Sequence, residues 1–314
     1  MNTRWSLAVL CLGALAIVGT SSAAPAPPAA TAAISIVDDT GVRLVLKRPA
    51  QRIVSLTPGG TEMLFAAGAG SRIVATVRGS DAPAAAKAIP TIGDANALDY
   101  ERLVALKPDV VVVWEDLTNR LVVESLRTLK LPLYFIRAKG LADIPRSVRK
   151  LGTLAGTRAV ADPAAAALES KLATVTGRPA AGPPLRVFYM IWAEPLYTVG
   201  NRHIISDAIG RCGGRNIFDD IDFPAPIVEI EAIVKRNPEV MLMSAPPITA
   251  RDWRERWAQF KTVQAVATRQ MLSFSDTRLD RMGPTAIDAV DGLCKMLDQA
   301  RAALKRDGQK PAAG

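Results

Sequence analysis

The chain has 314 residues, of which 49% are hydrophobic and 22% are charged. This length and composition predict one large or two ordinary globular domains and exclude a disordered or fibrous protein. The formal net charge is +9, yet lysine and arginine are scattered, with no run longer than a pair such as Arg149-Lys150. We therefore expect a dispersed basic surface and no nucleic-acid partner.

The N-terminus has the pattern of an export signal. Arg4 precedes an apolar stretch from Leu7 to Val18, and small residues follow from Ser21 to Ala24. This order predicts a cleavable signal peptide over residues 1–24. The apolar stretch is about 12 residues long, short of the roughly 20 that span a bilayer, so a retained membrane anchor is the weaker alternative.

Two of the three cysteines remain after removal of this leader, which contains Cys11. An exported protein leaves the reducing cytosol, so a disulfide between Cys212 and Cys294 is expected. Two unpaired buried thiols are the alternative.

Residues 25–33 are rich in alanine and proline and predict a flexible mature N-terminus. From residue 34 to 141 short apolar strands alternate with short helices, which is typical of a mostly parallel sheet covered on both faces. The expected elements are a hairpin at 35–37 and 42–46, strands at 52–56, 73–77, 110–114 and 133–136, and helices at 61–67, 101–107 and 117–129.

Residues 142–177 contain no strand pattern and predict a helical connection between two lobes. Asp162-Pro163 is placed as N-cap and first residue of a helix that continues through Ala164 to Val175. A stiff helical connection is expected to restrict lobe closure to small rotations.

Residues 178–314 repeat the alternation and predict a second α/β lobe. The expected elements are strands at 186–192, 196–200, 240–243 and 271–274, and helices at 204–211, 231–237, 252–259 and 284–303.

One unit occurs once in each lobe. Glu101 stands seven residues before Pro108, and Glu231 stands seven residues before Pro238. In both copies the proline ends a short amphipathic helix and a continuous apolar strand follows. The pattern predicts two related lobes, each presenting one carboxylate from the start of an equivalent helix. A coincidental match between two common α-to-β units is the alternative.

Several motifs in the same order resemble a known family. They are the segment from Arg52 to Gly68, the two Glu-to-Pro units, the segment from Cys212 to Phe218, and Leu293-Cys294. The chain resembles the periplasmic solute-binding proteins of vitamin B12, ferric siderophore and haem ABC importers, most closely those that bind cobalamin. This resemblance spans about Ile34 to Ala303.

The resemblance implies a fold and a function. The fold would be two Rossmann-like α/β lobes joined by a single long helix. The function would be capture of a corrinoid in the cleft between the lobes and delivery to the transmembrane permease of an ABC importer, with haem or a ferric siderophore as alternative cargo. It further implies a periplasmic monomer and a disulfide between Cys212 and Cys294.

The resemblance also implies roles for the two repeated acids. Residues that match Glu101 and Glu231 dock into arginine pockets of the permease, one per lobe. Exposed charges on rigid elements would set the orientation of the binding protein on the permease and the rate at which the two meet. The alternative is that each acid only stabilises the first turn of its helix.

Ligand contacts follow from the same resemblance. Tyr197 matches an aromatic residue that packs on the corrin ring, and Pro58 matches a position at the cleft floor. Asp276 and Arg281 match polar residues that line the cleft.

The chain departs from the family pattern at three aromatic positions. Ala225 replaces a tryptophan, Gly79 replaces a tyrosine, and the loop at 91–97 lacks a tryptophan. We expect Phe223 to supply aromatic surface in compensation. The remaining aromatic candidates are Trp114, Trp192 and Phe274, although Trp114 and Trp192 equally fit the buried core. Arg78, Arg202 and Arg278 are candidate positive charges for a carboxylate-bearing cargo.

The rival functions are an enzyme and an exported scaffold or signalling module that uses the same fold to bind another protein, and a receptor for a bare metal ion is also considered. His203 is the only histidine, so a zinc or manganese site with several imidazole ligands is not expected, nor is a cofactor. Axial ligation of a cargo metal by His203 is a minor alternative to an exposed position beside a helix cap. Since no dinucleotide fingerprint, phosphate-binding loop or nucleophile motif occurs, we expect no catalysis.

Overall fold

The computed structural model of the protein describes residues 1, 33–94, 97–176, 182–244 and 250–308. The predicted leader and the predicted flexible segment at 25–33 therefore lie almost wholly outside the described residues. Among the helices of the described ranges, none combines the length and apolarity that a membrane span requires.

The first lobe is built on a parallel sheet of four strands in the order β4-β3-β5-β6. The strands are β3 (Ile53–Ser55), β4 (Ile73–Ala75), β5 (Val110–Trp114) and β6 (Leu133–Ile136). All five residues of β5 are buried, as expected for a central parallel strand covered on both faces. The predicted parallel sheet is confirmed.

The hairpin predicted ahead of this sheet is also confirmed. β1 (Ile34–Val37) pairs antiparallel with β2 (Arg43–Leu46). Asp38 closes the turn, because its Oδ1 accepts hydrogen bonds from the backbone of Thr40 and Val42. This is the local side-chain bonding that favours aspartate in turns.

Three helices of the first lobe surround the sheet: α1 (Pro58–Ala66), α2 (Tyr100–Ala105) and α3 (Arg120–Thr128). α1 begins earlier than the predicted residue 61. Thr57 is its N-cap and accepts a hydrogen bond from Gly60 N, and Pro58 occupies the first turn, where a missing N–H costs nothing. Gly59 and Gly60, which precede the predicted start, therefore lie inside the helix.

The predicted connection consists of two helices, α4 (Asp143–Ala155) and α5 (Arg158–Thr176). Gly156 ends α4 in the left-handed conformation, with φ of 68°, which glycine adopts without strain. α4 packs on α1 and β1 of the first lobe, and α5 packs on α4 and on the last helix. α5 is therefore the one helix that joins the two lobes.

α5 starts at Arg158, four residues ahead of the predicted N-cap Asp162, so Pro163 lies inside the helix. The start is fixed instead by Thr157, whose carbonyl accepts hydrogen bonds from Val160 and Ala161. Thr157 also anchors the helix to the first lobe, because its Oγ1 donates to Ala67 O at 2.6 Å.

The second lobe holds a sheet in the order β11-β10-β7-β8, with β9 paired to β7. The strands are β7 (Leu185–Ala193), β8 (Leu196–Thr198), β9 (Gly214–Asn216), β10 (Val240–Ser244) and β11 (Met271–Phe274). β8 is antiparallel to β7, whereas β9 and β10 are parallel to it. β9 was not predicted, since Gly-Arg-Asn has neither apolar character nor strand propensity.

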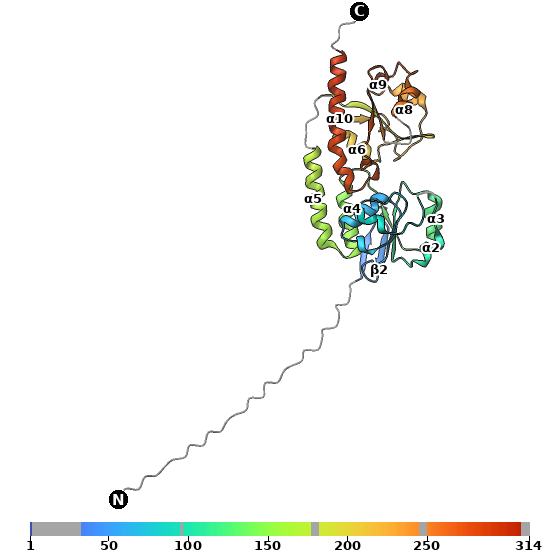
Figure 1. Ribbon diagram of the computed structural model, residues 1–314. Coiled ribbons are helices and arrows are strands. Elements are labelled where there is room, and N and C mark those ends of the chain that lie inside the picture. The colour runs from blue at the N-terminus through green and yellow to red at the C-terminus, as the bar shows by residue number, and fades with distance from the viewer. Residues whose placement is uncertain (2–32, 95–96, 177–181, 245–249, 309–314) are drawn as a thin grey trace, which may run out of the picture. The chain divides into compact units, whose positions relative to one another are not determined.

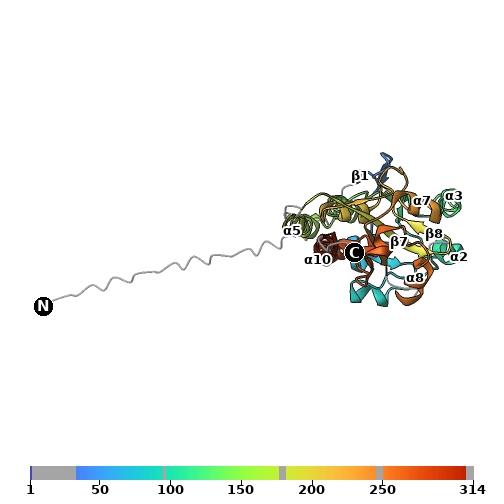
Figure 2. The ribbon, with the colours of Figure 1, turned by 90° about the horizontal axis from the view of Figure 1, so that it is seen from above.

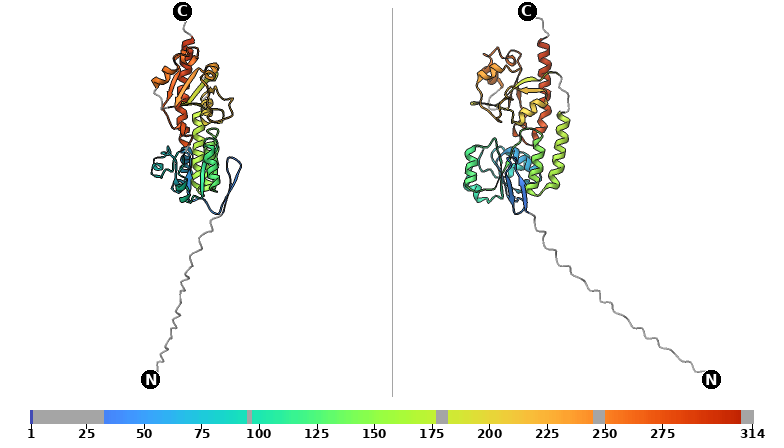
Figure 3. Two further views of the ribbon diagram at one scale, coloured as in Figure 1. Left: turned by 90° about the vertical axis from the view of Figure 1, so that its right-hand side faces the viewer. Right: turned by 180° about the vertical axis from the view of Figure 1, so that it is seen from behind.

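The helices of this lobe are α6 (Ile204–Arg211), α7 (Ile230–Arg236), α8 (Ala250–Trp257), α9 (Gln264–Ala267) and α10 (Pro284–Gly308). α10 extends five residues beyond the predicted end. Figures 1 and 2 show α5 and α10 side by side, at one side of the sheets. The same pair is visible from behind in Figure 3.

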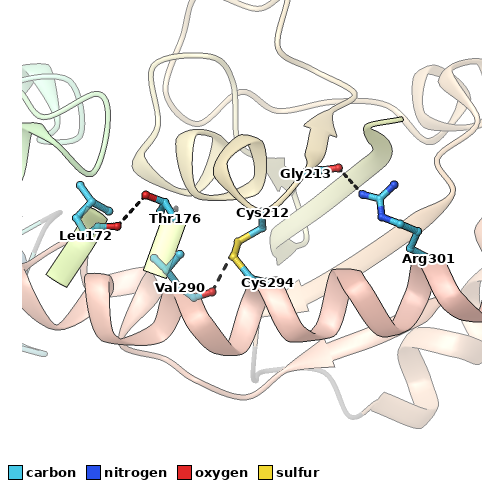
Figure 4. The surroundings of a disulfide bond; sticks show 7 residues. All are labelled: Leu172, Thr176, Cys212, Gly213, Val290, Cys294 and Arg301. Carbon is cyan, nitrogen blue, oxygen red and sulfur yellow. Dashed lines mark hydrogen bonds between the residues drawn. A yellow bond between two sulfur atoms is a disulfide. The ribbon is translucent and has the colours of Figure 1, made fainter. Parts of the chain in front are cut away.

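A disulfide joins Cys212, the C-cap of α6, to Cys294 within α10 (Figure 4). Arg301 of α10 adds a second link, since its Nη2 donates to Gly213 O at 2.7 Å. The expected disulfide is confirmed, and it fastens α10 to the first helix of the second lobe.

Candidate functional site

The two Glu-to-Pro units have the same structure as well as the same sequence pattern. Each unit is a helix, α2 or α7, followed by the buried strand β5 or β10. The residue before each proline has positive φ, 46° at Lys107 and 44° at Asn237. The helices therefore end in the same way.

The contacts around the two units also correspond. Asp109 after Pro108 accepts the backbone N–H of Arg52 at 2.9 Å, and Glu239 after Pro238 accepts that of Arg186 at 2.9 Å. The strand registers match too, because Ile53 pairs with Val110 and Val187 pairs with Val240. The paired sequence pattern thus corresponds to a structural repeat.

Both repeated acids are exposed. Glu101 and Glu231 are the second residues of α2 and α7. On each helix the buried anchor lies two residues later, at Leu103 and Ile233, both fully buried. Each carboxylate is thus presented to solvent by a short helix whose opposite face is fixed in the core.

The predicted ligand residues follow the carboxyl ends of parallel strands. Pro58 follows β3, Tyr197 lies on β8 directly after β7, and Asp276 follows β11. Ligands of open α/β sheets bind at this edge. Four of the five predicted residues fall into two groups within the described structure, and Asp276 stands apart in its own loop.

The first group is formed by Pro58 and Arg281. The short helix η3 (Leu279–Arg281) packs on the first turn of α1, so that a Cβ on Gly59 would lie 2.4 Å from Arg281 O. Pro58 also lies beside Gly79, whose added Cβ would be 3.6 Å from Pro58 Cγ. The glycine that replaces the family's tyrosine therefore borders the predicted position at the cleft floor.

Arg281 connects the two lobes electrostatically. Its Nη1 lies 2.7 Å from Asp81 Oδ1 and 3.9 Å from Glu62 Oε1, both in the first lobe. Glu62 is 4% exposed and accepts hydrogen bonds from Thr285 N and Oγ1 at 3.1 and 2.6 Å. Burial raises the pKa of Glu62, and the bonds from Thr285 and the charge of Arg281 oppose that rise.

Neither Glu62 nor Asp81 was singled out from the sequence. Glu62 stands inside an apolar helix, between Thr61 and Met63, and this isolated charge among buried residues was the available signal. The pairing of Asp81 with Arg281 depends on a contact between residues 200 positions apart, for which a single sequence carries no signal.

The second group is formed by Tyr197 and Phe223. The chain at 223–228 runs antiparallel to β8, because Gly200 N donates to Pro224 O and Thr198 N donates to Pro226 O. Phe223 is 48% exposed and Tyr197 is half-buried. Phe223 is thus exposed on the segment that pairs with β8, four residues before Ile227, the partner of Tyr197.

Asp276 is engaged within its own loop. Arg278 donates to both of its carboxylate oxygens, at 2.8 and 2.5 Å, and these bonds lower the pKa of Asp276. Arg278 is therefore neutralised and is not a free positive charge for cargo. Arg202 is likewise paired, with Asp222 at 3.3 Å and Asp116 at 3.9 Å.

Asp116 belongs to a carboxyl pair that follows β5. Hydrogen bonding to Arg137 is the main cause that lowers the pKa of Glu115 to about 2, whereas burial raises the pKa of Asp116 to about 6. Arg202 approaches this pair from the second lobe. A second electrostatic contact thus joins the lobes.

The other aromatic candidates differ in burial. Trp114 and Phe274 are each 3% exposed and belong to the core, so Phe274 offers no surface to cargo. Trp192 is 47% exposed, with Nε1 donating to Glu194 O. A core role for Trp192 is therefore wrong, because its neighbour Ala193 occupies the core face of the strand and Trp192 points to the opposite face.

His203 is buried, at 4% exposure, and is the N-cap of α6. Its Nδ1 accepts a hydrogen bond from Ile205 N at 3.1 Å, and desolvation lowers its pKa to about 4. The expected exposed position is wrong, and the buried ring is not available for axial ligation. The described residues contain no cluster of acidic, histidine or cysteine side chains that would hold a metal ion.

A cavity of about 420 Å³ lies elsewhere, between Gly140 and α6. Three of its charged side chains are already paired: Asp207 accepts from Leu141 N at 2.8 Å and pairs with Arg211, and Arg215 pairs with Asp219. None of the predicted ligand residues lines this cavity.

Comparison with known proteins decides the family. The family of periplasmic binding proteins matches residues 53–272, which is more than half of the chain. The chain belongs to the periplasmic binding protein family. The vitamin B12-binding protein of Vibrio cholerae is 30% identical to this periplasmic binding protein over 254 residues, covering 81% of this chain and 91% of the relative.

Solved structures agree. The crystal structure of the periplasmic vitamin B12-binding protein BtuF of Vibrio cholerae superposes with a TM-score of 0.70 at 30% identity, covering 81% of this chain and 98% of that one. The periplasmic haem-binding protein RhuT of Roseiflexus sp. superposes with a TM-score of 0.67 at 22% identity, covering 80% and 99%, a likeness in fold alone. The two-lobed fold with one connecting helix is thus confirmed, and this family consists of binding proteins.

Proposed function

We propose that this periplasmic binding protein captures a corrinoid between its two lobes and delivers it to the permease of an ABC importer. The observation that carries the proposal is the structural repeat, which presents one exposed glutamate from an equivalent helix of each lobe. The vitamin B12-binding relatives at 29 to 30% identity support the corrinoid as cargo. Haem and ferric siderophores are the alternative cargo.

Glu101 and Glu231 are proposed to dock on the permease, one on each of its two subunits. Two carboxylates on rigid helices suit this role, because a charge-assisted contact with arginine gives orientation without a large buried area. Neither acid contributes to the core of its lobe, so a substitution of either acid can change the docking contact without lowering the stability of the fold.

Pro58, Tyr197, Phe223, Asp276 and Arg281 are proposed to contact the cargo. Tyr197 and Phe223 offer aromatic surface from the second lobe, and Pro58 lies at the meeting point of α1 and η3. The ion pairs of Asp276 and Arg281 support a role in fixing the shape of the site. Both side chains are also proposed to form hydrogen bonds with the edge of the cargo.

Export is part of the proposal. Residues 1–24 are proposed to be a cleaved signal peptide and residues 25–33 a flexible start of a periplasmic, monomeric protein. We propose domain limits at 34–141 for the first lobe, 142–177 for the connecting segment and 178–314 for the second lobe. We propose no catalytic activity.

The test is a titration of the purified protein with cyanocobalamin, cobinamide, haemin and a ferric hydroxamate siderophore, followed by visible absorbance and by calorimetry. The proposal expects saturable 1:1 binding of a corrinoid in preference to the other three. Binding of haemin or of the siderophore alone would replace the corrinoid as cargo. No binding of any of them would contradict the proposed function.

A further inference from the structure

The second lobe carries a row of apolar side chains across three neighbouring segments. Trp192 of β7 pairs with Tyr197 of β8, and Tyr197 pairs in turn with Ile227. Side chains at paired positions of adjacent strands lie on the same face, about 4.5 to 5.5 Å apart at Cβ. We name Trp192, Tyr197 and Ile227 the apolar row.

The opposite face of the same ribbon is buried. Ala193 pairs with Leu196, and Val228 N donates to Leu196 O. These three residues pack into the core around Trp253 and Trp257. Because side chains alternate between the two faces of a strand, the apolar row points away from this core.

The row is unusually exposed for its composition. Trp192 is 47% exposed and Ile227 is 55% exposed, and Phe223, at 48%, lies on the same segment as Ile227. Among the described residues, Trp192 and Phe223 are the two aromatic side chains counted as exposed. Their occurrence on one ribbon indicates a surface that is covered by something else when the protein works.

The row also lies where the two lobes meet. It follows the carboxyl end of β7, which is the ligand-binding edge of such a sheet. Arg202, shortly after β8, reaches Asp116 at the carboxyl end of β5 in the first lobe. A molecule held between the lobes therefore faces this ribbon.

We infer that Trp192 and Ile227, on either side of Tyr197, form one apolar wall that contacts a flat ring face of the cargo. This inference rests on the proposed function. It selects Trp192 from the aromatic candidates of the sequence and adds Ile227, which the sequence did not single out. The wall offers ring-stacking surface from two neighbouring strands.

The test compares corrinoid affinity in the wild type and in the variants Trp192→Ala, Trp192→Phe and Ile227→Ser. Loss of an anchoring aromatic contact is expected to weaken binding about tenfold or more in Trp192→Ala, and Ile227→Ser is expected to weaken it about threefold or more. Trp192→Phe retains a ring and is expected to stay closer to the wild type. Leu121→Ala on α3 is the matched control, since Leu121 is 70% exposed in the first lobe, and its affinity should not change.

Hydroxyl-radical labelling read by mass spectrometry gives a second readout that needs no variant. Trp192 should be oxidised in the free protein and protected when cyanocobalamin or haemin is bound. Wild-type binding with unchanged affinity in Trp192→Ala and Ile227→Ser, and without protection of Trp192, would overturn this inference and leave the proposed function standing. Absence of binding by the wild type would overturn both.

Discussion

The two lobes share one helix-to-strand unit but differ in the surfaces that meet between them. The unit ending in β5 and the unit ending in β10 agree in helix end, strand register and exposed acid. By contrast, the first lobe presents acids, among them Asp116 and Asp81, and the second presents the apolar row together with Arg202 and Arg281. This difference fits the proposed function, in which the two like units dock on two permease subunits and the two unlike surfaces contact one asymmetric cargo.

The lobes also differ in how they are fastened. Apart from Cys11, which falls in the proposed signal peptide, both cysteines of the sequence lie in the second lobe. The first lobe depends on packing of α1, α4 and α5 instead. Stability and pH response should therefore differ between the two halves.

Removal of the disulfide is expected to cause the greatest loss of stability. The double variant Cys212→Ser plus Cys294→Ser should lose about 4 kcal/mol of unfolding free energy, because the bridge closes a loop with a separation of 82 residues. Urea unfolding measures the loss, and hydrogen exchange should quicken in β7 and β10 more than in β3 and β5. Equal quickening in both sheets would contradict a fastening confined to the second lobe.

The next largest effect is a pH response in the second lobe. Burial lowers the pKa of His203 from 6.5 to about 4, so the unfolded chain binds more protons between these values. Above pH 6.5 His203 is neutral in both the folded and the unfolded state, and the free energy of unfolding is unaffected. As the pH falls below 6.5 the unfolded state is favoured, and the free energy of unfolding drops by up to about 3 kcal/mol near pH 4. The cap of α1 in the first lobe is Thr57, which does not titrate in this range.

His203→Asn isolates this effect, because asparagine is a good N-cap and does not titrate. The difference in urea midpoint between wild type and variant should change as the pH falls from 7 to 4.5, in favour of the variant. A difference that stays constant over this range would show that His203 is not held neutral by burial.

A smaller effect is expected for cargo affinity. Tyr197→Ala should weaken cargo binding by roughly 1 to 3 kcal/mol if the ring stacks on the cargo, and Tyr197→Phe should bind nearly as well as the wild type. Calorimetric titration distinguishes the two variants. Equal affinities for all three proteins would place the cargo away from the second lobe's apolar row.

Much of the fold was predictable from the sequence because buried parallel strands are written as continuous apolar runs. β5, β6 and β11 have the predicted limits, and so does α6. β9 and the start of α5 were missed, since they are fixed by neighbours in space: β9 by pairing with β7, and α5 by the contact of Thr157 with Ala67.

The candidate site was predictable only in part. Glu101 and Glu231 could be singled out from the sequence, because the repeated Glu-to-Pro unit is visible within one chain. The exposure of Trp192 was not predictable, because the local sequence does not show whether the end of a buried strand is covered by other elements. The contacts of Arg281 with Asp81 and Glu62 cross the boundary between the lobes, and local sequence does not encode such pairs.

Cargo delivery by the variant Glu101→Ala plus Glu231→Ala tests whether these two glutamates dock the protein on the permease. Uptake of labelled cobalamin by cells that depend on this protein should be abolished, while the affinity of the purified variant for cargo stays within about twofold of the wild type, since exposed docking charges lie outside the cargo contacts. Glu124→Ala plus Asp298→Ala, which removes the same charge from two other exposed positions, should deliver normally. Normal uptake by the Glu101 and Glu231 variant, or a loss of affinity as large as the loss of uptake, would contradict the account.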